Sequence, residues 1–388
     1  MRAARVVLQA LTVAGILVAA GAACDEPKTP ESPQNPTPSP NAEVLTAADG
    51  TRFAVEVIAT NLEITWALAF APDGRLFFTE RPGRVRVMQG GQVLATPALT
   101  LSDVAASGEG GLLGLALHPD FATNHFVYLA YDARLAGGGR ETRLVRYRES
   151  GNTLAEPAVL LDGVNAADIH DGARLKFGPD RKLYMTMGDT ADPPTAQDLG
   201  RLTGKILRFN DDGTVPADNP FPGSPIYSYG HRNPQGLDWQ PGTNQLWNAE
   251  HGPTGNDEIN RTVAGHNYGW PVIEGDQTRA GMDAPVLFFT PSIAPSGASF
   301  YTGTAIAGFR NNLFVAALGQ QLLLRVRFDA NDPTKVIAQE RLMQGKFGRL
   351  RDVITGPDGA LYVCTSNRDG RNTPVAADDR IIKISAAR

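Results

Sequence analysis

The stretch Leu68-Ala69-Phe70-Ala71-Pro72-Asp73-Gly74-Arg75-Leu76-Phe77-Phe78 decides the fold, because its pattern returns along the chain. An alternating apolar segment meets a Pro-Asp-Gly turn, and an aromatic-rich segment leaves it, which is the pattern of a β-hairpin. Five further copies, the fourth of them weaker, begin at Leu115, Leu175, Leu237, Ala298 and Val353. Repeats at intervals of roughly 45 to 70 residues are typical of propellers. The sequence therefore predicts an all-β, six-bladed β-propeller of four-stranded antiparallel blades. A β-sandwich, the alternative, would not repeat one phrase six times.

The composition agrees with this fold and excludes one class of partner. The 388 residues include 41 Gly and 28 Pro, which indicates many turns and few long helices. The formal net charge is -5, so no basic face is expected on which nucleic acid could release its counterions. A small neutral ligand is a better candidate than nucleic acid.

The N-terminal segment has the layout of an export signal. Arg2 and Arg5 precede a mostly apolar run over residues 6–20, which is shorter than the roughly 20 residues that span a bilayer. Residues 21–24, Gly-Ala-Ala-Cys, resemble a bacterial lipobox, in which Cys24 would carry lipid. Gly21 replaces the usual aliphatic residue, so cleavage without lipidation is the alternative. We expect residues 1–24 to be a lipoprotein-type signal and the protein to be periplasmic or on the cell surface, anchored through Cys24.

Residues 25–43 are rich in proline and nearly free of apolar side chains. Such a segment cannot bury enough surface to fold, so we expect a disordered tether ahead of a catalytic propeller over residues 44–388. If Cys24 carries lipid, Cys364 is the remaining thiol and no intrachain disulfide forms. Cys364 lies in a strand pattern, which favours a buried, inert thiol.

Two carboxylate and histidine groupings are candidates for chemistry. His170 precedes the third copy of the repeat, and Asp189 follows its second strand. Because the strands of a hairpin are neighbours, Asp189 can return beside His170 and orient its imidazole as a general base. The alternative is a histidine satisfied by local backbone. The glycine-rich segment 108–114 is followed by a strand and lacks the helix of a phosphate-binding loop, so its glycines more plausibly permit a close approach to the propeller axis.

A second grouping comprises Arg232 and Asn233, ahead of the fourth copy, and residues 250–258, Glu-His-Gly-Pro-Thr-Gly-Asn-Asp-Glu. Carboxylates and kinked backbone carbonyls are the hard oxygen ligands that calcium prefers. The alternatives are a turn network for the first pair and an acidic surface turn for the second segment.

Several motifs in the same order resemble those of the PQQ-dependent soluble glucose and aldose sugar dehydrogenases, where PQQ is pyrroloquinoline quinone. They are GEGGLLGLALHPDF, HxxxRLxFGPD with LYMTMGD, GHRNPQGL, HGPTGNDEIN, GHNYGWP, APSGA and RLRDVITGPDGALYV, which together span residues from about 53 to 385. The resemblance implies a sugar-oxidising quinoprotein with PQQ and calcium as cofactors.

The resemblance also implies roles for individual residues. The catalytic residues would be His170 as general base, Asp189 as its supporting carboxylate and Arg232. The quinone would be contacted by Arg232 and Asn233, and its carboxylates by Arg349 and Arg351, with Glu109 and His251 also in the cofactor site. Active-site calcium would be bound by the carbonyls of Gly252 and Pro253, and a further calcium by Glu258 and Tyr268.

Three positions depart from the family pattern. His251 stands where glucose dehydrogenases have Gln, Glu109 where a Gln near the quinone is usual, and Gly319 where a Lys contacts PQQ. We expect the lost cation and the added carboxylate to weaken the binding of the tri-anionic cofactor.

The sequence thus predicts an enzyme that oxidises the anomeric carbon of aldoses to lactones, with an external electron acceptor to reoxidise PQQ. A sugar is the expected small-molecule partner, nucleic acid is not, and the membrane would be reached only through the lipid. The alternatives are a calcium-dependent propeller lactonase and a non-catalytic propeller that binds glycans or a protein.

Overall fold

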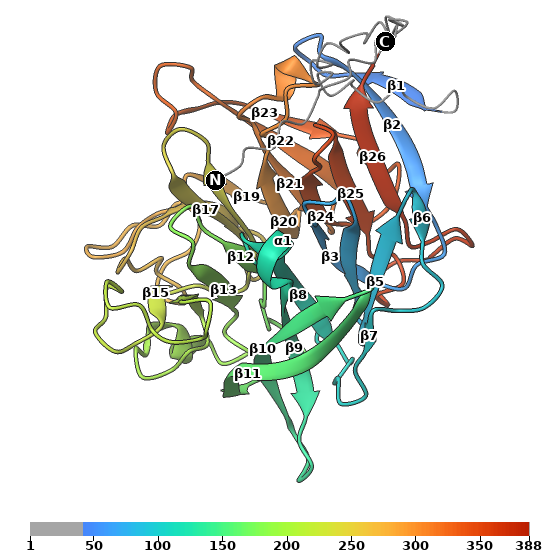
Figure 1. Cartoon of the computed structure of the whole chain (residues 1–388). Helices are drawn as coiled ribbons and strands as arrows, with labels where there is room; N and C mark the ends of the chain where they lie inside the picture. The colour runs from blue at the N-terminus through green and yellow to red at the C-terminus, as the bar shows by residue number, and fades with distance from the viewer. Residues whose placement is uncertain (1–41, 388) are drawn as a thin grey trace, which may run out of the picture. The chain divides into compact units, whose positions relative to one another are not determined.

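The computed structural model describes residues 42–387, so the predicted signal, Cys24 and nearly all of the tether lie outside the described residues. Six antiparallel sheets are arranged around a central channel as the blades of a β-propeller, which confirms the predicted fold (Figure 1). Within residues 42–387, no helix is long and apolar enough to cross a lipid bilayer.

The first three blades follow one another along the chain. Blade one contains β3 (Thr65–Phe70), β4 (Leu76–Glu80), β5 (Arg84–Gln89), β6 (Gln92–Val93) and β7 (Leu99–Thr100), of which β6 and β7 both pair with β5. Blade two contains β8 (Leu112–Leu117), β9 (Phe126–Arg134), β10 (Arg140–Ser150) and β11 (Thr153–Asn165), with the short helix α1 (Phe121–Asn124) after β8. Blade three contains β12 (Leu175–Phe177), β13 (Leu183–Met187), β14 (Lys205–Phe209) and β15 (Ile226–Tyr229), with the 3-10 helix η1 (Pro193–Gln197) after β13.

The remaining blades continue in the same order, and the last blade also contains two strands from the N-terminal part of the chain. Blade four contains β16 (Pro234–Gln240), β17 (Gln245–Glu250), β18 (Asp257–Thr262) and β19 (Leu287–Phe289). Blade five contains β20 (Pro295–Phe300), β21 (Leu313–Ala317), β22 (Leu322–Phe328) and β23 (Val336–Leu342), with the 3-10 helix η2 (Ala307–Phe309) after β20. Blade six contains β24 (Leu350–Thr355), β25 (Leu361–Thr365), β26 (Ile381–Ala386), β2 (Arg52–Ala59) and β1 (Glu43–Thr46).

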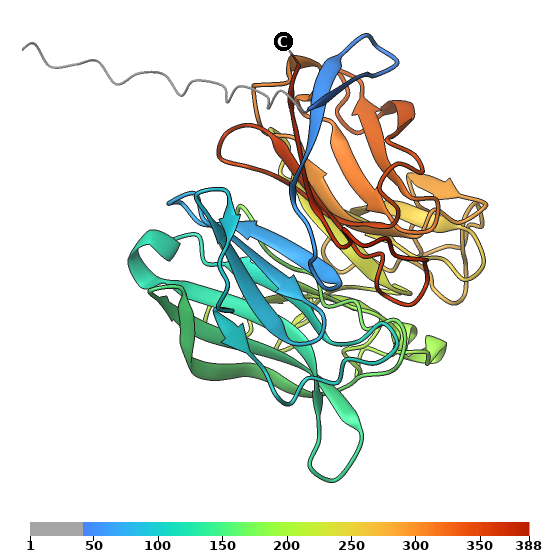
Figure 2. The ribbon, with the colours of Figure 1, turned by 90° about the vertical axis from the view of Figure 1, so that its right-hand side faces the viewer.

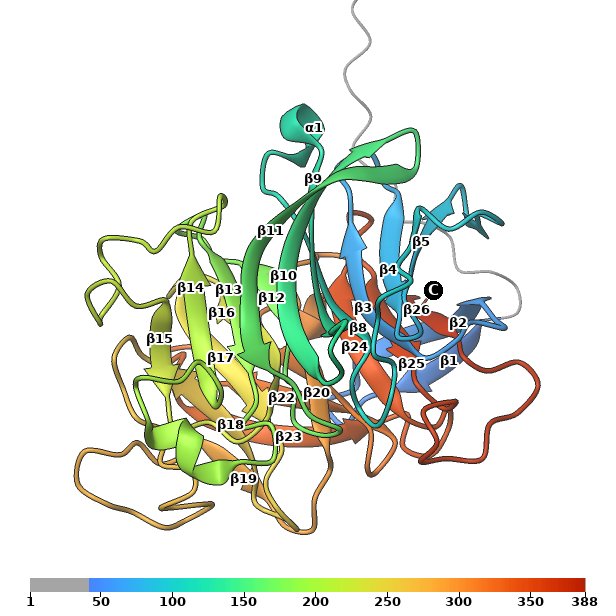
Figure 3. The same cartoon turned by 90° about the horizontal axis from the view of Figure 1, so that it is seen from below.

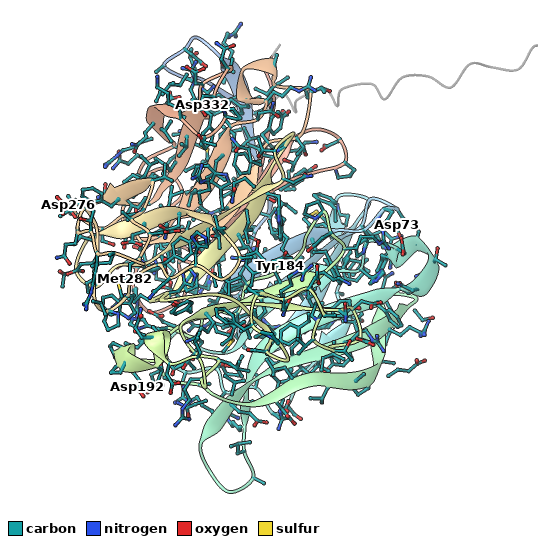
Figure 4. The ribbon with its side chains drawn as sticks, turned by 90° about the vertical axis from the view of Figure 1, so that its left-hand side faces the viewer. Asp73, Tyr184, Asp192, Asp276, Met282 and Asp332 are labelled. Atoms are coloured by element: carbon teal, nitrogen blue, oxygen red, sulfur yellow. The ribbon has the colours of Figure 1, made fainter. Side chains whose placement is uncertain are left out.

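Each copy of the repeated phrase forms the two inner strands of a blade, as the sequence predicts. The pairs are β3–β4, β8–β9, β12–β13, β16–β17, β20–β21 and β24–β25. Two copies show why the phrase recurs: the hydroxyls of Tyr184 and Tyr362 donate to the turn carboxylates of Asp180 and Asp358, each at 2.9 Å. The aspartate therefore fixes the turn and also satisfies the buried tyrosine that follows it. Tyr184, which is 3% exposed, is labelled near the middle of Figure 4, whereas the exposed Asp73 lies at the right-hand side of the view.

The ring is closed by the N-terminal strand β2, which pairs with the C-terminal strand β26 in blade six. Figure 2 shows these two strands side by side, near the two ends of the colour scale. Phe53 and Val55 on β2 are buried in the same apolar cluster as Ile384 of β26. The pairing covers what would be an open sheet edge and joins blade six to blade five, because that cluster also contains Phe309 and Phe314.

Inner strands from all six blades line a central cavity, whereas β15 and β19 lie farther from the middle of the molecule than β12 and β16 (Figure 3). Arg174 and Asp352 form a 3.1 Å ion pair within this cavity. The predicted site residues Asn233 and Arg349 lie directly before β16 and β24, at the ends where inner strands begin. Cys364 is fully buried and its pKa is raised by burial, in agreement with the prediction of an inert thiol.

Closure by β2 gives a prediction about truncation. A chain that begins at Ala42 should keep the cooperative melt of the whole protein, because β1 and β2 are intact. A chain that begins at Thr60 should lose it, because blade six would expose β26 and the apolar face that Phe53 and Val55 cover. Differential scanning calorimetry of both truncated chains measures this. A sharp, unshifted transition for the shorter chain would show that the closing strand is dispensable.

Candidate active site

The loop before β12 and the loop after β13 bring His170 and Asp189 together, as the hairpin argument predicts. The His170 Nδ1 lies 2.7 Å from Asp189 Oδ1. Because an ionised carboxylate only accepts, Nδ1 donates and Nε2 carries the lone pair. The His170 side chain is 12% exposed, so Nε2 belongs to a partly sheltered imidazole that a small substrate can still reach. This arrangement suits a general base.

The backbone of His170 is held in a left-handed conformation with φ of 64°. Its N–H donates to Glu109 Oε2 at 3.0 Å, and its carbonyl lies so close to Gly188 that a Cβ there would overlap it. Glycine is therefore required at position 188 for the loop to pack against the strand end. The strain is stored where the candidate base lies, a placement typical of functional loops.

Trp270 connects the histidine pair to Arg232, and the sequence reasoning assigned it no role although it lies in the quoted GHNYGWP motif. Its indole N–H donates to Asp189 Oδ2 at 2.8 Å, and the Arg232 guanidinium lies over its ring at 5.2 Å. Asp189 thus accepts from two sides, and Trp270 holds its orientation. Arg232 Nη1 also donates to the carbonyls of Gly252 and His251, at 2.7 and 3.2 Å.

Several polar atoms at this end of the channel are buried with no hydrogen-bond partner in residues 42–387. They are both amide atoms of Asn233, which is 1% exposed, together with Arg232 Nε, Arg351 Nε and His251 Nε2. Buried polar atoms are nearly always paired, so this concentration needs an explanation. A polar ligand with carbonyl and carboxylate oxygens would satisfy the donors among these atoms, which are Asn233 Nδ2, Arg232 Nε and Arg351 Nε, so the residues present fit a quinone cofactor such as PQQ.

Arg349 and Arg351 lie side by side before and within β24, where the sequence places them. Arg349 Nε donates to Asp369 Oδ2 at 2.9 Å, and Arg351 Nη2 lies 3.5 Å from the same oxygen. Arg351 Nη1 also donates to Gln235 Oε1 at 2.9 Å. Burial lowers the pKa of Arg351 to about 10, which leaves it charged at neutral pH. Asp369 and Gln235, both missed in the sequence, therefore orient these two guanidinium groups.

Glu109 does not stand in the site as an unpaired carboxylate. Arg371 forms a 2.8 Å ion pair with its Oε1, and His170 N–H binds its Oε2. Burial opposes ionisation of Glu109, but the His170 hydrogen bond and nearby cations lower its pKa overall. The expected repulsion toward an anionic cofactor is thus offset by Arg371, which the sequence could not reveal because it lies 262 residues farther along the chain.

The Nε2 atom of His251 is buried, and burial lowers the pKa of the imidazole to about 4. The neutral imidazole at pH 7 resembles the glutamine of related enzymes in carrying no charge. Its substitution for Gln therefore changes shape and hydrogen bonding at the site more than electrostatics.

One small cavity contains the predicted calcium ligands Gly252, Pro253 and Glu258, together with Glu250 and Glu274. Burial, and then the neighbouring Glu250, raise the pKa of Glu258 to about 8, and Glu274 Oε2 is buried without a partner. These carboxylates lie close together and lack enough positive charge to balance them. Such a group is suited to bind a hard cation such as calcium. The carboxylates do not converge as a ready-made ligand set, since residues 42–387 contain no metal-binding cluster of three acidic, His or Cys side chains.

The structure does not bring the Tyr268 side chain into this cavity. Its hydroxyl donates to Arg261 O and accepts from Val263 N, both at 2.8 Å, and its ring stacks on His231 at 4.9 Å. The Tyr268 side chain thus fixes a turn of blade four. The pairing of Tyr268 with Glu258 as calcium ligands stays a prediction.

A buried carboxyl pair, Asp132 and Asp171, lies behind the histidine loop and was not found from the sequence. Thr142 Oγ1 donates to Asp132 Oδ1 at 2.9 Å, and Ala167 N donates to Asp171 Oδ1 at 2.9 Å. A Cβ on Gly110 would lie 2.5 Å from Asp132 Oδ2 and 3.3 Å from Asp171 Oδ2, so the two carboxyl groups meet at that glycine. Burial raises the pKa of Asp132 to about 6, and burial with the Asp132 charge raises that of Asp171. We interpret the pair as sharing a proton.

This pair gives a pH prediction. The pKa of Asp132 is higher in the folded chain than the ~3.9 of an unfolded one, so the folded state binds more protons and loses stability as pH rises from about 4 to about 6. Asp132→Asn cannot ionise and should lose less melting temperature over that range than the wild type. Asp162→Asn, an exposed carboxylate of the same blade, is the control and should follow the wild type. Parallel pH profiles for wild type and Asp132→Asn would contradict the shared-proton interpretation.

Comparison with known proteins places this site in a family. Residues 62–376 match the family model described as "Glucose / Sorbosone dehydrogenase". The chain is 36% identical to the aldose sugar dehydrogenase YliI of Escherichia coli, over 81% of this chain and 91% of that one. It is 30% identical to quinoprotein glucose dehydrogenase B of Acinetobacter calcoaceticus, over 92% of each chain. It superposes on the PQQ-bound aldose sugar dehydrogenase of Streptomyces coelicolor with a TM-score of 0.76 and 36% identity, covering 86% of this chain and 98% of that one. The chain is an enzyme and belongs to the glucose/sorbosone dehydrogenase family.

Proposed function

We propose that this protein oxidises the anomeric carbon of aldose sugars to lactones, using PQQ and calcium with His170 as general base. Relatives along most of the chain are named as sugar dehydrogenases, and a structural neighbour holds PQQ. The observation that carries the proposal is the 2.7 Å contact between His170 and Asp189, beside buried donors without partners.

When bound, PQQ supplies the acceptor for the hydride that leaves the anomeric carbon. The chain must remove the remaining proton from the anomeric hydroxyl. Nε2 of His170 accepts it, and the imidazolium that forms is stabilised by the hydrogen bond from Nδ1 to Asp189. The sugar thereby loses one hydride and one proton and becomes a lactone. Because Trp270 also donates to Asp189, the carboxylate keeps its place while the charge on the imidazole changes.

Arg232 and Asn233 are suited to hold the quinone oxygens. The Arg232 Nη1 is engaged with the carbonyls of blade four, which leaves the buried Nε to donate to a ligand. Asn233 adds an amide with no partner of its own within residues 42–387. Donors fixed before the reaction stabilise negative charge as it develops on the acceptor and need no reorganisation.

The carbonyls of Gly252 and Pro253, beside Glu258, would hold calcium, which supplies Lewis-acid polarisation of the acceptor. The Gly252 carbonyl also accepts a hydrogen bond from Arg232 Nη1 at 2.7 Å. A sugar is the proposed substrate and an external acceptor removes the electrons. We also retain the proposal of export with a lipid anchor at Cys24, ahead of a proline-rich tether.

The function is tested by adding PQQ to purified apoprotein at fixed calcium concentration. We expect a quinone absorbance band and reduction of an artificial dye that depends on an aldose. Chelation of calcium should abolish dye reduction. Hydrolysis of lactones in the absence of PQQ, without dye reduction, would favour a propeller lactonase. Neither activity, with no PQQ bound, would favour a binding module.

Substitution of the proposed base gives a sharper test. His170→Ala should lower the rate of sugar oxidation by roughly 10² to 10⁴, because proton removal then depends on water, while the PQQ affinity stays nearly unchanged. His266→Ala is the matched control, since His266 forms a similar 2.7 Å contact with Asp283 on the exposed surface. Stopped-flow reduction of bound PQQ by glucose measures the step directly. Equal rates in His170→Ala and wild type would exclude His170 as the base.

A further inference from the structure

Arg81 lies directly after β4, at the channel end that contains Arg349 and Glu109, and has no role in the site described so far. Its backbone is fixed on both sides, because its N–H donates to Ile64 O at 3.0 Å and its carbonyl accepts from Leu112 N at 2.9 Å. Gly111 lies over its side chain, where a Cβ would be 2.6 Å from Arg81 Cγ. The glycine-rich segment that looked like a phosphate loop therefore encloses the stem of this arginine.

The Arg81 side chain is largely buried and makes no ion pair within residues 42–387. The residue is 8% exposed, its Nε is buried with no hydrogen-bond partner, and none of the ion pairs within residues 42–387 includes it. Burial lowers the pKa of Arg81, which expresses the cost of keeping this charge away from water. An uncompensated buried charge is strongly destabilising, so an arginine is rarely kept in such a place without an anion to bind.

The nearby carboxylates are already engaged. Asp369 accepts from Arg349 at 2.9 Å and lies 3.5 Å from Arg351. Glu109 is paired with Arg371 at 2.8 Å. Asp369 and Glu109 are also the carboxylates that act on Arg81, and they do so only through longer-range attraction. Four guanidinium groups therefore share two carboxylates in this part of the site, and the surplus of positive charge is centred on a group with no partner.

Gly319, which stands where the family pattern has a lysine, cannot provide the positive charge that the cofactor would need. A Cβ on Gly319 would lie 3.1 Å from Ala294 Cβ and from the Ile293 carbonyl, so the position has little room for a side chain. Arg325, another nearby cation in the sequence, is fully buried in blade five and paired with Asp49 at 2.7 Å and Glu340 at 3.2 Å. Arg325 therefore cannot replace the positive charge that is missing at Gly319.

We propose that Arg81 binds a carboxylate of the cofactor and supplies the positive charge that Gly319 does not provide. The inference rests on the proposed function, because it concerns the same cofactor. With Arg349 and Arg351 it gives one guanidinium for each carboxylate of a tri-anion. A guanidinium suits this role, since its fork can bind both oxygens of a carboxylate.

The test compares the PQQ affinity of the wild type with that of Arg81→Gln, Arg81→Lys and Arg148→Gln by isothermal titration calorimetry at fixed calcium. Arg81→Gln should lose about 10- to 100-fold in affinity, the scale of a charge-assisted contact. Arg81→Lys should retain part of it, because the charge remains without the fork. Arg148→Gln removes the same charge from an exposed pair with Glu156 and should bind PQQ like the wild type.

A second measurement separates ligand binding from a structural role. The melting temperature of Arg81→Gln without PQQ should equal or exceed that of the wild-type apoprotein, because the substitution removes a buried, unpaired charge. A lower melting temperature together with weaker PQQ binding would assign Arg81 to the fold and overturn the inference.

The outcomes also distinguish the inference from the proposed function. Equal PQQ affinities of wild type and Arg81→Gln would overturn the role of Arg81 while the function stands. Failure of the wild type itself to bind PQQ would overturn both.

Discussion

The pairing of β2 with β26 is the interaction on which the rest of the structure depends. This pairing completes blade six and holds the N-terminal end of the chain, which continues into blade one, against the C-terminal strand. The candidate site has the same requirement. Arg349, Asp369 and Arg371 come from blade six, whereas Glu109 and His170 come from the loops that lead into blades two and three. The ion pair between Arg371 and Glu109 therefore joins the loop after β25 of blade six to the loop that leads into blade two.

The second constraint is electrostatic. The end of the channel that contains His170 gathers guanidinium groups whose charges are only partly balanced by Asp369 and Glu109. Such an arrangement destabilises the free protein and is relieved when an anion binds. The unliganded site is therefore preorganised for an anion, which lowers the cost of binding it. The buried, unpaired amide of Asn233 follows the same logic. A channel end of this kind is organised for a polar, anionic ligand before that ligand arrives.

The departures from the family pattern have different consequences in three dimensions. Glu109 is not free to repel a cofactor, because Arg371 neutralises it and His170 N–H binds it. His251 is a neutral group through burial. Gly319 lacks the positive charge of the lysine in the family pattern, and we propose that Arg81 supplies that charge instead. Weaker binding of PQQ as a result of these departures stays a prediction.

The sequence by itself determined the fold, the number of blades and the order of the site motifs. Each hairpin is local, and the residues that form its turn are consecutive in the chain. It also predicted the contact of His170 with Asp189, whose loops flank one hairpin. Only the tertiary structure decided which charges pair across the channel. Arg371 and Glu109 are separated by most of the chain and meet only after the blades assemble. Burial likewise decided the protonation of His251 and Asp132, because the desolvation of a group depends on every blade that surrounds it.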